Sequence, residues 1–384
     1  MGNSPRSTAP APKGHPLAAT VLRAKRILQA HPVVCLLLLA PEVEYLTGSS
    51  RLSFLVAQPL LFALFLAQNL ASYGSAVLLI REARARWTLG WAGVLLLGAC
   101  YGIVNEGLGV STLFRTGMTG LAGVGAYGHY GGINWLNVTS LIAIVHPLFS
   151  VSIPILFLDL ALPETRRRPL LDRREIALAF YALTADTVVT CIFVYRVTGF
   201  AAGPVLWTAC LATIGLLVVL ARRIPKDLIR PATAEPRLRP LAFALLGGCF
   251  VWALGLVQAV LVRVQVPPPL VIAWLLGFAG LSLVIVLKFV GRAQSEPHVV
   301  ALSGGLVLSL IPMGLSTQFA TGPGLIPLLG GDLVAVWFVL YLWRKYRRRD
   351  PLGSQGPPKS GRPSSTLQRP QGGAASSRAP PAPR

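Results

Sequence analysis

The residues best suited to chemistry lie inside an apolar stretch, where Asn105 and Glu106 stand side by side in CYGIVNEGLGVSTLFRTG (100–117). A carboxylate at membrane depth is energetically expensive and normally faces a partner or a water-filled cavity. Gly98 and Gly102 precede Glu106 at intervals of four, so small residues share its helix face and another helix can approach closely. We therefore predict an intramembrane polar site at Glu106. The alternative is a protonated Glu106 that only donates a structural hydrogen bond.

His146 is the natural partner of Glu106. It belongs to a set of residues that follow helical spacing along one face of the next apolar segment: Trp135, Thr139, Ile142, His146 and Ser150. If the two helices are antiparallel, Glu106 lies about 12 Å and His146 about 18 Å from their outer ends. These depths allow contact, and a Glu/His pair inside a membrane is typical of proton-coupled proteins. A purely structural hydrogen-bonding role for His146 is the alternative.

Four further polar residues complete the predicted site: Asn105, Asn134, Thr139 and Glu44. Glu44, in APEVEYLTG, lies at the outer end of a short first helix broken at Pro41. It could form a mouth together with Glu106, and a solvated helix end is the alternative. The five cysteines fall inside apolar runs without metal-site spacing. The sequence thus indicates no metal site and identifies no cofactor.

The composition places these residues in a lipid bilayer. Hydrophobic residues make up 53% of the 384-residue chain and charged residues 13%, and the mean hydropathy is +0.62, outside the balance of a soluble domain. The net charge of +21 comes from Lys and Arg that gather in loops and tails, as the positive-inside rule requires of cytoplasmic segments. We therefore predict a multi-pass protein of the cell membrane and no nucleic-acid partner.

The elements that must position the site are apolar helices. We predict an all-α polytopic transmembrane bundle of about ten helices near 30–46, 52–80, 87–114, 134–162, 176–195, 204–221, 240–262, 269–290, 298–318 and 326–343. Alternate connections are rich in Arg, which predicts that both termini are cytoplasmic. Arg81, at the end of the second helix, is interpreted as one of these topology signals. Pro59 and the stretch 72–75 are the predicted kink sites of that helix.

Four regions follow from the distribution of polar residues. We predict a basic cytoplasmic arm over 1–29, a transmembrane half with the polar residues over 30–165, an apolar transmembrane half over 166–343, and a disordered basic cytoplasmic tail over 344–384. The tail is rich in Pro, Gly and Ser and lacks the apolar residues that would offset the entropy of ordering.

Several stretches resemble a group of uncharacterised prokaryotic multi-pass membrane proteins: SYGSAVLLIRE (72–82), YGIVNEGL (101–108), GINWLN (132–137) and HPLFSVSIPI (146–155). The resemblance covers about residues 33–170. It implies a multi-pass membrane fold and no established activity.

A weaker resemblance links the chain to the CAAX-processing and bacteriocin-protection family of intramembrane proteases. It depends on NEGLG (105–109) and IAIVH (142–146), although Asn105 stands where that family has a second Glu. This resemblance implies that Glu106 activates water and that His146 orients the water or stabilises the oxyanion.

Three classes of function stay open, so the sequence does not decide whether the protein is an enzyme. A transporter-like protein would use a Glu/His pair to couple proton movement to a small-molecule or ion substrate. An intramembrane protease-like hydrolase would use Glu106 and His146 as above. A membrane scaffold or partner subunit would use neither.

Overall fold

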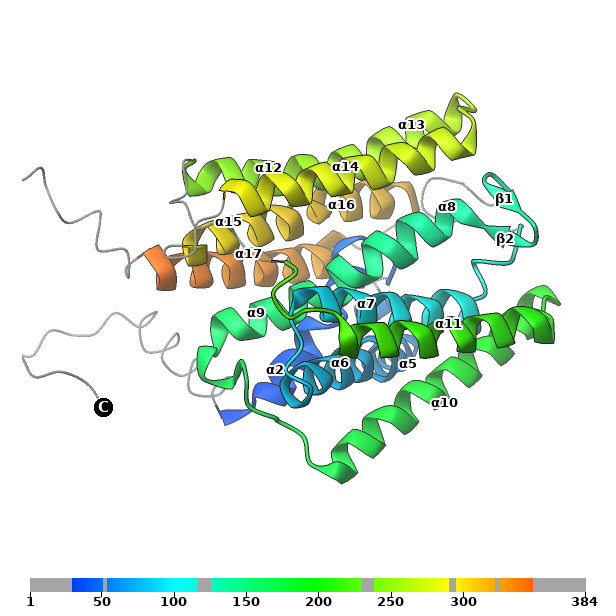
Figure 1. The fold of residues 1–384 in the computed structure, drawn as a ribbon, viewed down its shortest axis with the longest axis horizontal. Coiled ribbons are helices and arrows are strands. Elements are labelled where there is room, and N and C mark those ends of the chain that lie inside the picture. Colours follow the sequence, from blue (N-terminus) through cyan, green and yellow to red (C-terminus); the bar gives the residue numbers. More distant parts are fainter. Residues whose placement is uncertain are drawn as a thin grey trace, which may run out of the picture.

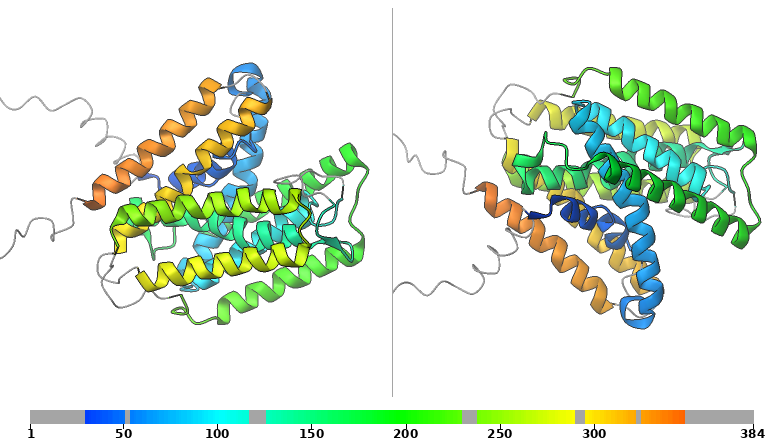
Figure 2. Two further views of the ribbon diagram at one scale, coloured as in Figure 1. Left: turned by 90° about the horizontal axis from the view of Figure 1, so that it is seen from above. Right: turned by 90° about the horizontal axis from the view of Figure 1, so that it is seen from below.

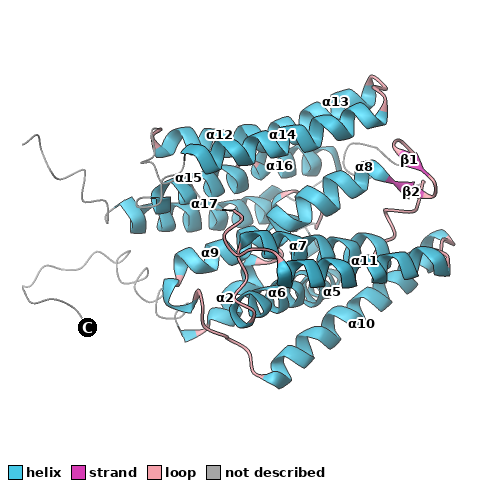
Figure 3. Cartoon of the chain, in the orientation of Figure 1, coloured by secondary structure: helices cyan, strands magenta, loops and turns pink. Residues whose placement is uncertain are grey.

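The computed structural model describes residues 30–50, 54–116, 126–229, 238–289, 295–321 and 325–347. The predicted N-terminal arm and residues 348–384 of the predicted tail lie outside the described residues. Helices account for nearly all regular structure (Figures 1 and 3). Within the described residues the strands are β1 (His129–Tyr130) and β2 (Ile133–Asn134), which pair as a small antiparallel hairpin. The predicted all-α polytopic fold is therefore confirmed.

The first half of the chain forms three long helices that change their winding. They are α5 (Pro59–Asn69) with the π-helix η1 (Leu70–Gly74) and α6 (Ser75–Arg86), then α7 (Trp91–Gly102) with the π-helix η2 (Ile103–Gly109), and then α8 (Trp135–Asn137) with the π-helix η4 (Val138–Ser152) and α9 (Ile153–Ala161). A short 3-10 helix, η5 (Pro163–Thr165), follows. A π-helix closes its bonds over five residues instead of four, so its wider turns redirect the side chains that it carries.

The second half forms further long helices. They are α10 (Arg173–Thr198), α11 (Pro204–Arg223), α12 (Pro240–Trp252) with the π-helix η6 (Ala253–Val257) and α13 (Gln258–Arg263), α14 (Pro268–Phe289), α15 (Ser295–Leu308) with α16 (Leu310–Thr321), and α17 (Leu325–Arg347). The start of α10 is fixed by a capping box between Asp172 and Glu175, which satisfies backbone N–H groups at the helix start.

Eight helices within the described residues are long and apolar enough to cross a membrane. The segment predicted as the first span, 30–46, is not one of them, because it forms two short helices, α2 (Pro32–Leu39) and α3 (Glu42–Leu46). Pro41 has no N–H and its ring opposes a continuous helix, so the chain breaks there. The predicted break at Pro41 is therefore present, and the two short helices keep 30–46 out of the eight candidates.

Helix α17 covers the predicted tenth span but is also not among the eight, and it carries Asp332, Arg344 and Lys345. It continues to Arg347, so the first residues of the predicted tail are helical. The Tyr346 ring is buried, and its hydroxyl donates to the Leu160 carbonyl over 2.9 Å. The end of α17 is therefore packed against α9.

The predicted kink sites have two different outcomes. At Pro59 the helical segment is interrupted, because α4 (Phe54–Ala57) ends before Gln58 and α5 begins at Pro59. The stretch 72–75 coincides with η1, where the winding changes within one continuous helix.

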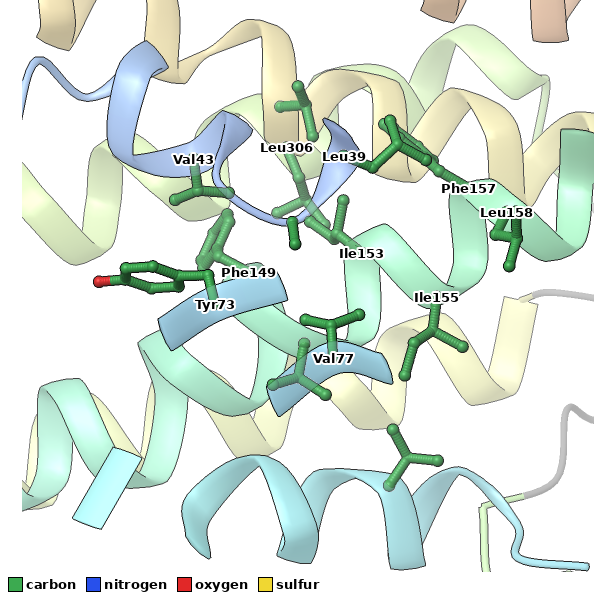
Figure 4. Packing of buried hydrophobic residues seen from close by; sticks show 14 of the residues in the cluster. Leu39, Val43, Tyr73, Val77, Phe149, Ile153, Ile155, Phe157, Leu158 and Leu306 are labelled. Atoms are coloured by element: carbon green, nitrogen blue, oxygen red, sulfur yellow. The ribbon is translucent and has the colours of Figure 1, made fainter. Parts of the chain in front are cut away.

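The hydrophobic core is built mainly from helices of the first half, with further residues from α12 to α17. Figure 4 shows side chains of α2, α3, η1, α6, η4 and α9 interlocking, among them the fully buried Val77 and Ile155. Figure 2 shows α16 and α17 beside α2 and α3. Helices α10 and α11 instead carry exposed apolar residues such as Leu178 and Val205. The apolar outer faces of α10 and α11 suit contact with lipid tails. The polar residues of the first half lie on helices further inside the bundle.

Candidate intramembrane site

Glu106 and His146 meet inside the bundle. Glu106 lies on η2 and His146 on η4, and the distance from Glu106 Oε1 to His146 Nε2 is 3.0 Å. The side chains are 12% and 3% exposed, respectively. The structure therefore brings together the two residues that the sequence analysis paired, and a functional role for them stays a prediction.

Two glycines let the helices of this pair approach. A Cβ added at Gly98 would lie 2.6 Å from Pro147 Cα, and one at Gly102 would lie 3.2 Å from His146 Cβ. The first distance is too short for any side chain, so Gly98 permits contact between the two backbones. Gly109 does not face this contact, because the side chain nearest to a Cβ added there is that of Thr190 on α10.

Every polar atom of the pair has a partner within the protein. His146 Nδ1 lies 3.2 Å from the Ser150 hydroxyl. The Thr112 hydroxyl donates to Oε2 of Glu106, and Oε1 faces His146. Both ring nitrogens and both carboxylate oxygens are thus engaged.

Two tyrosines enclose the imidazole. The Tyr73 ring stacks on His146 with centroids 6.3 Å apart, and the Tyr101 ring meets it edge-on at 5.4 Å. Asn105 donates to the Tyr73 hydroxyl over 3.2 Å. In Figure 4 the Tyr73 hydroxyl points away from the surrounding apolar side chains. The tyrosines therefore separate the pair from the apolar core while they present hydroxyl groups to polar neighbours.

Glu44 joins the same group from α3. Its carboxyl group hydrogen-bonds with Tyr73 and lies within electrostatic range of His146 and Glu106. We call these residues the histidine cluster: Glu44, Tyr73, Tyr101, Asn105, Glu106 and His146. Four of the six residues predicted for the site belong to it.

Asn134 and Thr139 lie outside the histidine cluster. Asn134 accepts a hydrogen bond from the Asn137 N–H over 3.0 Å and caps α8. The Thr139 hydroxyl donates to the Trp135 carbonyl over 2.9 Å, which is the usual choice of a threonine inside a helix. The structure therefore does not bring these two residues to the pair, because each satisfies the backbone of its own helix.

Sequence reasoning missed the tyrosines and an acidic neighbour. The Tyr101 hydroxyl lies 3.1 Å from that of Ser72, and Asp186 on α10 hydrogen-bonds with Ser72 and Gln68. Two signals were available, since Tyr101 precedes Asn105 by four residues and Asp186 is the one carboxylate of the apolar run 176–195. Neither signal predicts contact between helices so far apart in sequence.

A second polar group lies where α6 ends. Arg81 pairs with Glu82 at 2.7 Å and Arg84 with Asp159 at 2.6 Å, and Arg166 approaches Asp159 to 3.7 Å. We call these five residues the arginine cluster. Arg81 also donates to the Thr165 carbonyl, and the Leu170 N–H donates to Glu82 over 2.6 Å.

The interpretation of Arg81 as a topology signal is therefore incomplete. Its side chain is 2% exposed and holds the end of α6 against the segment that follows α9. Because Asp159 and Glu82 are buried with it, each charge depends on the others. The arginine cluster therefore stabilises the packing of α6 against α9 and the segment that follows it.

The fold and the buried polar clusters define an integral, multi-pass membrane protein whose environment is the lipid bilayer. A family model described as an uncharacterised membrane protein family matches residues 33–341. The chain belongs to that family, and the match reaches well beyond the region 33–170 in which the resemblance was noted. No curated protein and no solved structure matches the chain. These comparisons do not extend the likeness to intramembrane proteases.

Proposed function

We propose that the protein is a transporter-like protein of the cell membrane in which Glu106 and His146 hold and release a proton as the helices rearrange. The observation that carries this proposal is their 3.0 Å contact between two inner helices. A carboxyl group and an imidazole at this distance share a hydrogen bond whose strength depends on the number of protons they hold. A change of protonation would therefore loosen or tighten the contact between η2 and η4.

The local winding supports a movable site. Three π-helices supply the histidine cluster with Tyr73 (η1), Asn105 and Glu106 (η2), and His146 (η4). π-helical turns are frequent at functional sites. A shift of one such segment toward α-helical winding would turn its side chains away from their partners and would change access to the pair.

The contacts favour this function over hydrolysis. An activated water would need a free carboxylate oxygen or ring nitrogen, together with donors for an oxyanion. In this structure Thr112 donates to Oε2 of Glu106, the Ser150 hydroxyl contacts Nδ1 of His146, and Asn105 donates to Tyr73. A hydrolase would first have to break these bonds. A small polar molecule or an ion is the substrate class of the proposed transporter.

Proton-coupled uptake into proteoliposomes tests the proposal. Vesicles that contain the protein and a trapped pH-sensitive dye are exposed to amino acids, carboxylic acids, nucleosides and sugars in turn. We expect one class to change the internal pH, and we expect Glu106→Gln to abolish this response. Glu164→Gln is the matched control, because this exposed carboxylate lies outside both clusters. A response that survives Glu106→Gln would overturn the proposal, and peptide cleavage lost in Glu106→Gln would favour the hydrolase.

A further inference from the structure

An apolar pocket of about 340 Å³ lies between α3, η4, η6, α13 and α16. Its walls include Val43, Phe149, Leu254 and Met313. In Figure 4, Val43 and Phe149 lie near each other on neighbouring helices. This volume is at the lower end of the range of small-molecule sites, and the histidine cluster does not use it.

One polar side chain of the pocket has no hydrogen-bond partner among the described residues. Gln258 is 6% exposed and lines the pocket. Within the described residues its amide makes no hydrogen bond. A buried amide normally has a partner, and its nitrogen can donate while its oxygen accepts. The amide of Gln258 is therefore placed to bind a ligand that enters the pocket.

The lining defines the chemistry of that ligand. Among the residues that the structure describes, no Asp, Glu, Lys, Arg or His lines the pocket, so the part of the ligand that it holds is neutral. Trp252 and Leu256 lie at its wall and are also exposed on the outer side of the bundle. The pocket is thus accessible from the lipid.

The depth of Gln258 in the bilayer narrows the class of ligand further. It precedes Arg263, the last residue of α13, by five residues, a rise of about 8 Å. This distance from a helix end is close to the level where hydrocarbon gives way to the interfacial region of a bilayer. The other lining residues on η6, such as Leu254, lie deeper. A lipid at this position would have an ester carbonyl near Gln258 and a chain along the deeper wall.

We propose that this pocket binds one acyl chain of a bilayer glycerolipid and that its ester carbonyl accepts a hydrogen bond from the Gln258 amide. The bound chain lies beside the helices of the histidine cluster, because Val145 and Val43 line the pocket next to His146 and Glu44 in sequence. The inference does not depend on the proposed transport function, since it concerns binding alone.

Photolabelling tests the inference directly. The full-length protein is placed in nanodiscs that contain a phosphatidylcholine with a diazirine group in one acyl chain. After illumination, mass spectrometry locates the labelled peptides. We expect labelling concentrated within 251–259, above the level on the exposed surfaces of α10 and α11.

Two variants separate the polar contact from the cavity. Gln258→Leu removes the amide at similar size and should lower labelling roughly fivefold, the effect of losing about one neutral hydrogen bond. Gly255→Phe should abolish labelling, because a Cβ there has its nearest neighbour, Met313 Cε, at 3.7 Å and the ring would fill the pocket. Gly280→Phe is the matched control, since nothing lies within 4 Å of a Cβ at that position.

Labelling that is unchanged in Gln258→Leu would overturn the assignment of the ester carbonyl, even if Gly255→Phe failed to fold. Labelling of 251–259 that does not exceed that of α10 and α11 in the unmodified protein would overturn the site itself.

Discussion

The arginine cluster and the histidine cluster both bury carboxylates, but they give these groups different partners. In the first, Arg81 and Arg84 each pair with a carboxylate at 2.7 Å or less. In the second, Glu106 pairs with an imidazole and a hydroxyl group. Arginine stays protonated in proteins, whereas histidine changes its charge near neutral pH.

This difference assigns the two clusters different tasks. A cluster whose cations cannot lose a proton keeps one arrangement and fastens α6 to α9. A cluster of Glu, His and Tyr can exist with different numbers of protons, so its hydrogen bonds can rearrange. Variants of the first should therefore damage folding, and variants of the second should damage function with little loss of stability.

The largest effect is expected from Arg81→Leu. This change removes the closest cation of the buried Glu82, which keeps a second ion pair with Arg86 at 3.2 Å. Removing one partner of a buried ion pair costs about 3–5 kcal/mol, and the remaining Arg86 places the expected loss near the lower end of this range. We expect most of the folded protein to be lost, as measured by size-exclusion chromatography in detergent and by thermal unfolding. Arg167→Leu, a change to an exposed arginine in the nearby loop, is the control. Equal stability of the two variants would show that the arginine cluster does not stabilise the packing of α6 against α9.

A smaller loss of stability is expected from Gly98→Leu. A side chain there would overlap the backbone of Pro147, and overpacking of this kind costs about 1–3 kcal/mol. The unfolding temperature of Gly98→Leu should be clearly lower than that of Gly215→Leu. Gly215→Leu is the control, since a Cβ at Gly215 has no neighbour within 4 Å. Unchanged stability of Gly98→Leu would mean that α7 and η4 can separate without cost.

The smallest effect on stability is expected from Tyr101→Phe. The change removes the hydrogen bond with Ser72 but keeps the ring contact with His146, so the loss should be about 1 kcal/mol. Tyr181→Phe, on the exposed face of α10, is the control. A loss of unfolding free energy as large as that of Arg81→Leu would show that the histidine cluster also stabilises the fold. This result would remove the distinction between the two clusters.

Part of the fold and of the histidine cluster can be predicted from the sequence. Apolar runs locate the long helices because a bilayer requires about 20 apolar residues to cross it. The Gly98 and Gly102 spacing, with the estimated depths of Glu106 and His146, predicts helices close enough for contact. Both inferences depend only on periodicity within single segments.

The remainder depends on packing between distant segments. The 3.6-residue period placed Thr139 on the face of His146, but η4 is wound as a π-helix and the Thr139 hydroxyl bonds its own backbone. The burial of Arg81 depends on the Thr165 carbonyl, which lies 84 positions further along the chain. No local pattern reports such a partner, and the same holds for Asp186 beside Ser72.

The most direct test of the central claim is infrared difference spectroscopy of the protein in nanodiscs between alkaline and acidic buffer. If Glu106 exchanges a proton with its surroundings through the pair, the unmodified protein shows a carboxylic-acid C=O band that Glu106→Gln removes and His146→Gln shifts, while Glu164→Gln leaves it in place. We predict that Glu106→Gln leaves the unfolding temperature of the protein nearly unchanged. A difference spectrum that is the same in the unmodified protein and in Glu106→Gln would contradict proton exchange at Glu106, because this carboxyl group would then keep one protonation state throughout.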